Sequence, residues 1–384
     1  MKRLKFFFFA LIITASIILN GCWDKVEIED RAFVMAIGID LFPESNKYVV
    51  TFQFPNAAQI AKGTSSGGGG SDKASFSVSI VADTIFSASR HLSTRLNKAL
   101  YLGHTQAIIL GEDVVENKEK FQEVLDSLDR SYELSRKLHL IVTPGKAQDI
   151  MLKDYTIEPN IGAYIQDVFK QSRRTSLFPN LDYNKIIKSI HDTDGNSIIP
   201  KIISGKDELR ISGSAIIKNY KLAGWLDNEE NMGYMWLTGN VKGGDVTFEM
   251  PGDGEDIKVP FDIFNVVTSK RVEEHNGKIK YIVKIVTEGD ITEYTFEKHG
   301  QMMNTKILNI MEKKTEDKIK MMIKKAADKF QKDAKVDMLG IGDYLEKYHP
   351  NVWDKYKDNW NEVFQDVEIK AEVSAHIRRI GLFR

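Results

Sequence analysis

Cysteine is almost missing from this chain, because Cys22 is the only one among its 384 residues. One thiol cannot form a disulfide within the chain or build a cysteine-rich metal site. Histidine offers no substitute, since the closest pair, His91 and His104, lies thirteen positions apart and cannot make a helical His-x3-His site. We therefore expect no metal site and no bound cofactor.

An excess of charge of either sign is also missing. The chain has 53 basic and 54 acidic residues, which gives a formal net charge of -1. Such a balance indicates no basic face for nucleic acid and no polybasic patch for anionic lipid. We therefore expect no nucleic-acid partner.

Local signatures of catalysis are absent as well. The sequence contains neither His-Glu-x-x-His nor Gly-x-Ser-x-Gly. The glycine-rich stretch 63–71 lacks the Lys-Ser/Thr that follows in a phosphate-binding loop, so a flexible loop is the preferred interpretation. A calcium loop starting at Asp192 would need Gly and Glu where Ser197 and Ile203 stand, which favours a solvated turn. A triad assembled from distant positions leaves no trace in sequence, but we expect no catalytic residues.

The longest apolar run, Phe6–Leu19, is too short to span a bilayer comfortably, which takes about 20 residues. A basic start precedes it and Gly21-Cys22 follows it, as in a bacterial lipoprotein signal. We predict a signal peptide at 1–21, cleaved after Gly21, with Cys22 carrying an S-diacylglycerol and an N-acyl chain. The alternatives are an uncleaved anchor helix and an ordinary signal peptide with an incidental cysteine.

In residues 22–150, segments whose apolar residues recur every second position, as in strands, alternate with segments that have the helical period of about 3.6 residues. This alternation predicts an N-terminal α/β domain. The expected strands cover 32–41, 48–54, 75–82, 103–110 and 134–143, and the expected helices cover 84–98 and 118–130. The strand over 48–54 should be half-buried, because its apolar residues fall on one face.

Residues 151–242 are predicted to form a less regular middle domain. Helices are expected over 160–171 and 181–189, followed by a hairpin of strands 209–218 and 221–226. Asp227 should then start a helix, because Glu230 stands three residues later as in a capping box.

Residues 243–384 are predicted to form a C-terminal antiparallel sheet packed by a long helix. Strands 257–273 and 278–289 flank Asn276-Gly277, a strong hairpin signal. A helix over 301–333 carries an apolar stripe rich in methionine, which favours packing on a sheet over an adaptable partner groove. The stripe comprises Met303, Ile307, Ile310, Ile319, Met322, Ile323, Ala326 and Phe330. Acidic residues interleave with the spaced aromatics Trp353 to Phe364, which favours core packing over nucleic-acid stacking. A half-buried strand closes the chain, so the fold class is α+β (mixed α/β) with several domains.

Several motifs carry a family resemblance. They are Cys22-Trp23-Asp24 with Glu27-Ile28 and Ile37-Gly38-Ile39-Asp40, Gly213–Lys218 with Ala223–Leu226, Asp337–Asp343 with Tyr348-His349-Pro350, and Arg378–Gly381. In this order they resemble the Ger(x)C family, the C subunits of nutrient germinant receptors in endospore-forming bacteria. Many members have a basic residue before Tyr-Pro where this chain has Tyr-His-Pro. The resemblance covers essentially the whole mature chain.

The resemblance implies a lipid-anchored subunit on the outer face of the spore inner membrane. It also implies assembly with an A subunit, which is partly membrane-embedded, and a B subunit that resembles amino-acid transporters. The family's C subunit is not its established ligand-binding component, so the small-molecule germinant need not touch this chain. The alternative function is a solute-binding lipoprotein of a membrane importer, which would have two similar α/β lobes around a ligand cleft.

Overall fold

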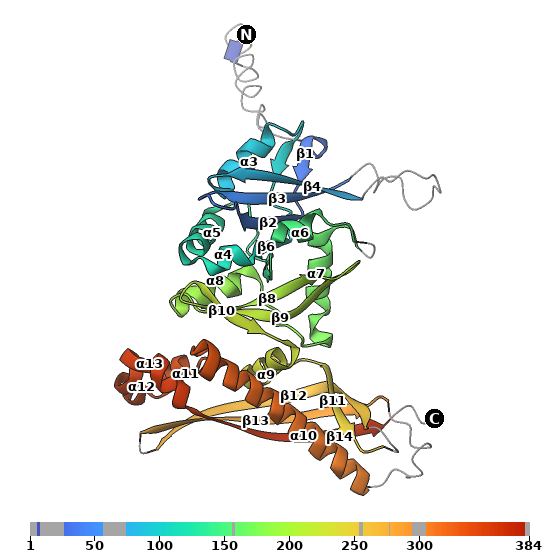
Figure 1. Cartoon of the computed structure of the whole chain (residues 1–384), viewed down its shortest axis with the longest axis vertical. Coiled ribbons are helices and arrows are strands. Elements are labelled where there is room, and N and C mark those ends of the chain that lie inside the picture. Colours follow the sequence, from blue (N-terminus) through green and yellow to red (C-terminus); the bar gives the residue numbers. More distant parts are fainter. Residues whose placement is uncertain are drawn as a thin grey trace.

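The computed structural model describes residues 6–7, 27–56, 74–155, 158–252, 256–275, 277–293 and 305–380. The molecule is elongated, with an eight-stranded sheet in one half and a four-stranded sheet in the other (Figure 1). The first described strand lies at one end of the long axis, and the four-stranded sheet lies at the opposite end (Figure 1).

The larger sheet has the strand order β10-β9-β8-β7-β6-β2-β3-β4. Neighbouring strands from β2 through β6 and β7 to β8 run parallel, and the remaining pairs are antiparallel. The strands are β2 (Ala36–Leu41), β3 (Tyr48–Pro55), β4 (Ser75–Ala82), β6 (Ala107–Gly111), β7 (His139–Thr143), β8 (Ser197–Ser204), β9 (Leu209–Lys218) and β10 (Lys221–Leu226). A separate short ribbon pairs β1 (Arg31–Phe33) with β5 (Ala99–Tyr101) in parallel.

Helices cover both faces of this sheet, each through its own apolar core. One face carries α3 (Ile85–Ser93), α4 (Glu112–Glu116), α5 (Lys118–Arg130) and α8 (Tyr183–Asp192). The other carries α6 (Ala147–Leu152) and α7 (Ile161–Gln171). The predicted helix over 118–130 is confirmed, whereas α3 and strands β6 and β7 are shorter than predicted.

The prediction of a half-buried strand over 48–54 is wrong, because β3 is buried on both faces. Its polar side chains lie under α6 and α7 and are hydrogen-bonded there. Thr51 Oγ1 lies 2.9 Å from Ser79 Oγ, and the backbone N–H of Ile161 donates to Gln53 Oε1 at 2.9 Å. The alternation of apolar and polar residues in β3 therefore reflects two buried faces, one packed in an apolar core and one hydrogen-bonded beneath helices.

The sheet continues across residue 150. β8 runs beside β7, and the predicted hairpin of β9 and β10 is confirmed at its outer edge. The predicted middle region thus contributes three strands to the N-terminal sheet. The division of the chain into domains at 22–150, 151–242 and 243–384 stays a prediction.

The smaller sheet has the order β11-β12-β13-β14. Its strands are β11 (Gly244–Met250), β12 (Ile257–His275), β13 (Lys278–Ile291) and β14 (Glu368–Ile380). The first three are antiparallel as predicted, but β14 runs parallel to β13. The connection between them contains a long helix that brings the chain back to the same end of the sheet, which permits a parallel pair.

That helix is α10 (Thr305–Asp328), which continues into the π-helical turn η5 (Lys329–Ala334). The predicted packing of its apolar stripe on the sheet is confirmed at Ile307 and from Ile319 to Phe330. Ile310 was assigned to the stripe but is 41% exposed, and Met311 is buried in its place. Met303, also assigned to it, lies outside the described residues, as does the glycine-rich stretch 63–71.

The remaining helices also pack against the smaller sheet. They are α9 (Asn228–Thr238), α11 (Ile341–Tyr348), α12 (Pro350–Tyr356) and α13 (Trp360–Val363). The 3-10 turns η6 (Lys357–Asn359) and η7 (Phe364–Asp366) flank α13, whereas η1 (Ile28–Asp30) and η3 (Ser172–Arg174) lie in the other half of the molecule. The aromatics from Trp353 to Phe364 pack on the core as predicted, although their helix is broken by η6. Across the described ranges, the two sheets differ in size and topology, unlike the two similar lobes that the importer alternative would require.

Candidate functional site

The predicted lipid attachment residue, Cys22, lies outside the described residues. The nearest continuously described stretch begins at Glu27, just before η1 and β1 at one end of the molecule (Figure 1). Among the helices that the structure describes, none is both long and apolar enough to cross a bilayer. The attachment of this chain to a membrane therefore stays a prediction.

A buried carboxylate occupies the end of β2, at the last residue of the predicted Ile-Gly-Ile-Asp motif. Asp40 is only 2% exposed, and it accepts the backbone N–H groups of Ala147 (2.6 Å) and Gln148 (2.8 Å) at the start of α6. Burial raises the pKa of Asp40 to about 6, although these two hydrogen bonds offset part of the effect. The motif residue therefore joins a strand to a helix more than a hundred positions away.

A second carboxylate, that of Asp113, lies beside Asp40. A Cβ atom on Gly111 would lie 2.1 Å from Asp40 Oδ1 and 2.9 Å from Asp113 Oδ1, so these two oxygens are within about 5 Å of each other. Asp113 Oδ2 accepts the backbone N–H of Leu41 at 3.0 Å, whereas its buried Oδ1 has no partner. Burial raises the pKa of Asp113 as well. The pair favours binding of a proton, and its hydrogen bonds hold the carboxyl end of the sheet together.

The predicted Asp-φ-φ-Gly-φ-Gly-Asp turn has a half-buried acid at its start. Asp337 accepts the backbone N–H groups of Leu339 (2.9 Å) and Gly342 (2.8 Å) and the indole N–H of Trp360 (3.1 Å). Burial raises the pKa of Asp337, and these donors oppose the rise. Asp337 and Trp360, 23 positions apart, thus belong to one hydrogen-bonded unit at the start of α11.

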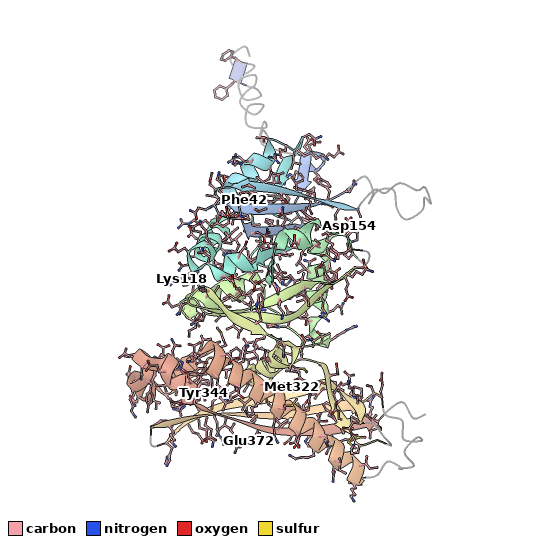
Figure 2. The ribbon with its side chains drawn as sticks, viewed as in Figure 1. Phe42, Lys118, Asp154, Met322, Tyr344 and Glu372 are labelled. Carbon is pink, nitrogen blue, oxygen red and sulfur yellow. The ribbon has the colours of Figure 1, made fainter. Side chains whose placement is uncertain are left out.

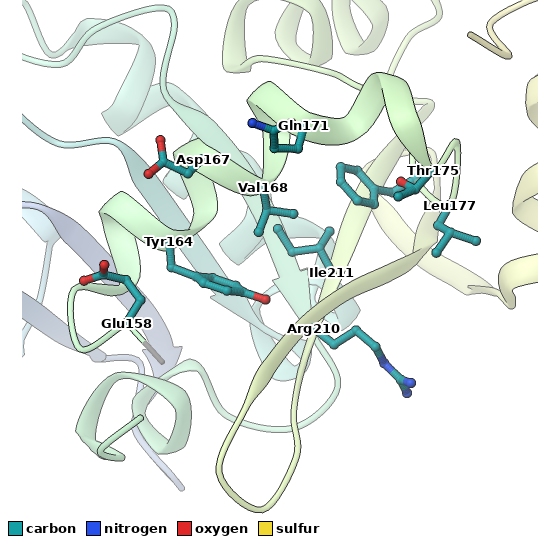
Figure 3. Close-up of a pocket in the computed structure, with 10 residues that line it drawn as sticks. Glu158, Tyr164, Asp167, Val168, Gln171, Thr175, Leu177, Arg210 and Ile211 are labelled. Carbon is teal, nitrogen blue, oxygen red and sulfur yellow. The ribbon is translucent and has the colours of Figure 1, made fainter. Parts of the chain in front are cut away.

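A pocket of about 490 Å³ lies between α7 and β9 (Figure 3). Its floor is mainly apolar, with Val168 from the helix and Ile211 from the strand. The charged groups of Asp167 and Arg210 lie on opposite sides of it and do not converge (Figure 3). Tyr164 donates its hydroxyl to the backbone carbonyl of Leu209. Nothing in this arrangement positions a nucleophile beside a base.

Among the residues that the structure describes, no group of three or more His, Asp or Glu side chains could hold a metal ion. His139 stacks on Phe169 with ring centroids 3.9 Å apart, and burial lowers the pKa of its imidazole. This histidine therefore belongs to the core beneath α7.

The junction between the two sheets is a feature that sequence reasoning missed. Glu229 on α9 accepts hydrogen bonds from Lys318 (2.6 Å) and Lys325 on α10. Lys218 at the end of β9 donates to the carbonyls of Ala334 (3.1 Å) and Lys335 (2.9 Å). These partners are 89 to 117 positions apart, and no local pattern signals a pairing at that range.

Figure 2 places Met322 on α10 at this junction, close to α9. Its side chain is 3% exposed and belongs to the core that α9, α10 and the smaller sheet share. The junction is therefore both apolar and ionic, and it joins the two halves of the molecule.

Comparisons with known proteins give a consistent result along the whole chain. Residues 24–204 match the family "Spore germination protein N-terminal domain", and residues 212–381 match "Spore germination B3/GerAC like, C-terminal". Spore germination protein KC of Bacillus subtilis (strain 168) is 29% identical, with 97% of this chain and 95% of that protein covered. Spore germination protein B3 of the same organism is 26% identical, with 97% of each chain covered.

The fold is similar to that in the crystal structure of the GerBC protein. The TM-score is 0.56 at 22% identity, with 89% of this chain and 96% of that chain covered. The N-terminal and C-terminal family domains follow one another here in order and meet at the connection between β8 and β9 of the larger sheet. This chain therefore belongs to the Ger(x)C family of spore germination proteins.

Proposed function

We propose that this protein is the lipid-anchored, non-catalytic C subunit of a spore nutrient germinant receptor. The observation that carries the proposal is the match to both family domains, in order, over residues 24–204 and 212–381. The similar full-length proteins are named as spore germination proteins, which supports a role in germination.

The anchor in this proposal is Cys22, acylated after cleavage behind Gly21. Cys22 stands five residues before Glu27, and a fully extended chain of that length reaches about 18 Å. The folded body would therefore start close to the membrane surface and extend away from it toward the four-stranded sheet. Two acyl chains or more suffice for stable anchoring, whereas one chain binds only marginally.

The partners in this proposal are the receptor's membrane-embedded A and B subunits, on the outer face of the spore inner membrane. Confinement to a surface raises the effective concentration of the body for such partners, and linked binding of this kind can exceed the separate affinities by about 100-fold or more, so weak contacts suffice for assembly. The subunit would act through these contacts, without binding the germinant itself.

The test is a strain in which Cys22→Ala replaces the wild-type chain. We expect the variant to leave the spore membrane fraction, to lose the A and B subunits on affinity purification, and to slow nutrient-triggered germination. Mass spectrometry of the wild-type protein should show an N-terminus at an acylated Cys22. Ser269→Ala, on the exposed side of β12, is the matched control.

Two results would contradict the proposal. One is an unmodified Cys22 in the native wild-type protein. The other is a Cys22→Ala strain that germinates normally with its protein still in the membrane fraction. Saturable binding of an amino acid, sugar or nucleoside by the purified protein, without the two partners, would favour the solute-binding alternative.

A further inference from the structure

We propose that the outward face of α3, together with Ile28, lies against the headgroup region of the bilayer that holds Cys22. This surface is called the membrane-proximal tip below. The proposal rests on the lipid anchor of the proposed function and adds a second, direct contact between the folded body and anionic phospholipid.

The position of the tip follows from the strand pairing. β1 begins four residues after Glu27, and its Arg31 pairs with Ala99 of β5. α3 contacts β5 and lies at the same end of the long axis as β1 (Figure 1). The tether that enters at Glu27 therefore brings this end, and not the four-stranded sheet, to the membrane.

Large apolar side chains are exposed at this end without a partner from the chain's core. Ile28 is 76% exposed and Phe86 is 64% exposed. Phe86, Arg90 and Ser93 follow one another at i, i+4 and i+7, so they share one face of α3. The guanidinium of Arg90 lies 5.0 Å from the ring centroid of Phe86. An aromatic ring flanked by a long cationic side chain suits a bilayer interface, where the ring is buried and the charge reaches the phosphates.

Charge is segregated around this face although the whole chain is balanced. The segment 84–111 contains no acidic residue but carries Arg90, Arg95 and Lys98. The acids of this end are Glu27, Glu29 and Asp30, on η1 and the residue before it, and Asp83 just before α3, which pairs with Lys47 at 3.4 Å. The helix side of the tip therefore presents cations near the membrane, where each basic residue adds attraction to anionic lipid. Net charge alone concealed this local asymmetry.

A rival surface exists on the four-stranded sheet, where Phe264 and Val267 are 52% and 60% exposed. Its charges are paired across strands, as Lys280 is with Glu368 (2.6 Å) and Arg378 with Glu288. A paired set of charges is typical of a solvated face, and this face lies at the end of the molecule remote from the tether (Figure 1). The tip is therefore the better candidate for a lipid contact.

The experiment uses the full-length lipidated protein in vesicles of phosphatidylcholine and phosphatidylglycerol. Because Cys22 is the only cysteine and its thiol is consumed by acylation, one introduced cysteine can carry a fluorophore alone. Ser93→Cys reports on the tip and Ser269→Cys on the remote sheet. With nitroxide-headgroup lipid as quencher, we expect quenching at position 93 to be at least about twofold stronger than at 269.

Matched variants test which side chains are responsible. Adding Phe86→Ser and Arg90→Ser to the Ser93→Cys protein should clearly lower quenching at position 93, although the tether still keeps this end nearer to the bilayer than position 269. Val267→Ser removes an exposed apolar side chain at the remote sheet and should change neither value. Circular dichroism of each variant checks that these exposed substitutions leave the fold intact.

The outcomes separate the two proposals. If the unsubstituted protein takes up the thiol label and stays off the vesicles, the anchor itself fails. If the protein is anchored but positions 93 and 269 are quenched equally, the lipid contact is overturned and the anchor stands. Protection of position 93 in spore membranes but not in pure lipid vesicles would overturn it in favour of a protein partner.

Discussion

A Cβ atom placed on Gly233 of α9 would lie 2.1 Å from the carbonyl oxygen of Met322 on α10, and 2.6 Å from its carbonyl carbon. Both are backbone atoms in the middle of a helix, so neither can move aside like a flexible side chain. The absence of a side chain at Gly233 therefore sets how closely the two helices approach. The core that joins the halves of the molecule depends on this contact.

We expect Gly233→Ala to destabilise the protein. Overpacking against backbone atoms should lie near the upper end of about 1–3 kcal/mol, and the better helix propensity of alanine returns about 1 kcal/mol, which leaves a net loss of about 2 kcal/mol. Chemical denaturation measures it. Gly205→Ala is the matched control, because its nearest neighbour is the exposed side chain of Glu208 at 3.1 Å. Equal stability of the two variants would rule out the close contact between the helices.

Asp40 makes the stability of the protein depend on pH. Its folded-state pKa is raised to about 6 by burial, so between about pH 4 and 6 the folded protein binds a proton more tightly than the unfolded chain. The resulting stabilisation is present at pH 4 and is lost as the pH rises through about 6, by up to about 3 kcal/mol. Asp40→Asn cannot titrate and should remove this loss.

Denaturation at several pH values between 4 and 7 checks the prediction. The free energy of unfolding of Asp40→Asn should fall less with rising pH than that of the wild type. Asp83→Asn serves as the control, since the Asp83 side chain is 76% exposed and should leave the slope unchanged. Wild-type and Asp40→Asn slopes that coincide would show that the buried carboxyl does not control the pH response.

The two aspartates of the turn before α11 should behave differently. Asp337→Ala would leave the backbone N–H groups of Leu339 and Gly342 and the indole N–H of Trp360 without their acceptor. We expect a loss of about 3 kcal/mol, because an unsatisfied buried donor costs about 1–3 kcal/mol. Asp343 is exposed, so Asp343→Ala should cost less than about 1 kcal/mol. Denaturation followed by tryptophan fluorescence measures both losses. A larger loss for Asp343→Ala than for Asp337→Ala would contradict this account.

The ion pair between α9 and α10 should be weak and sensitive to salt. Hydrogen bonds from Lys318 and Lys325 lower the pKa of Glu229, but the three side chains are between 25% and 46% exposed. A double-mutant cycle with Glu229→Ala and Lys318→Ala should give a coupling of about 0.5–1 kcal/mol at low salt. At about 1 M salt the Debye length falls to about 3 Å, and the coupling should shrink. An undiminished coupling at high salt would point to packing and not to charge.

Local patterns in the sequence identified most elements correctly. The capping box of Asp227 and Glu230 starts α9 as predicted, with both reciprocal hydrogen bonds at 2.8 Å. The Asn276-Gly277 signal correctly joined β12 to β13. The motif residues Asp40 and Asp337 were recognised, but their partners were not. The sequence offers no way to see that Asp40 meets Ala147, because their hydrogen bond spans 107 positions.

The amino-acid sequence by itself determined where helices and strands run and which family the motifs belong to, because periodicity, caps and turns act over a few residues. Only the tertiary structure decided that β3 is buried on both faces, that the larger sheet passes residue 150, and that β14 runs parallel to β13. Those features depend on which distant elements pack together. The sequence of one helix or strand shows which of its faces are apolar or polar, but not which distant segments pack against them.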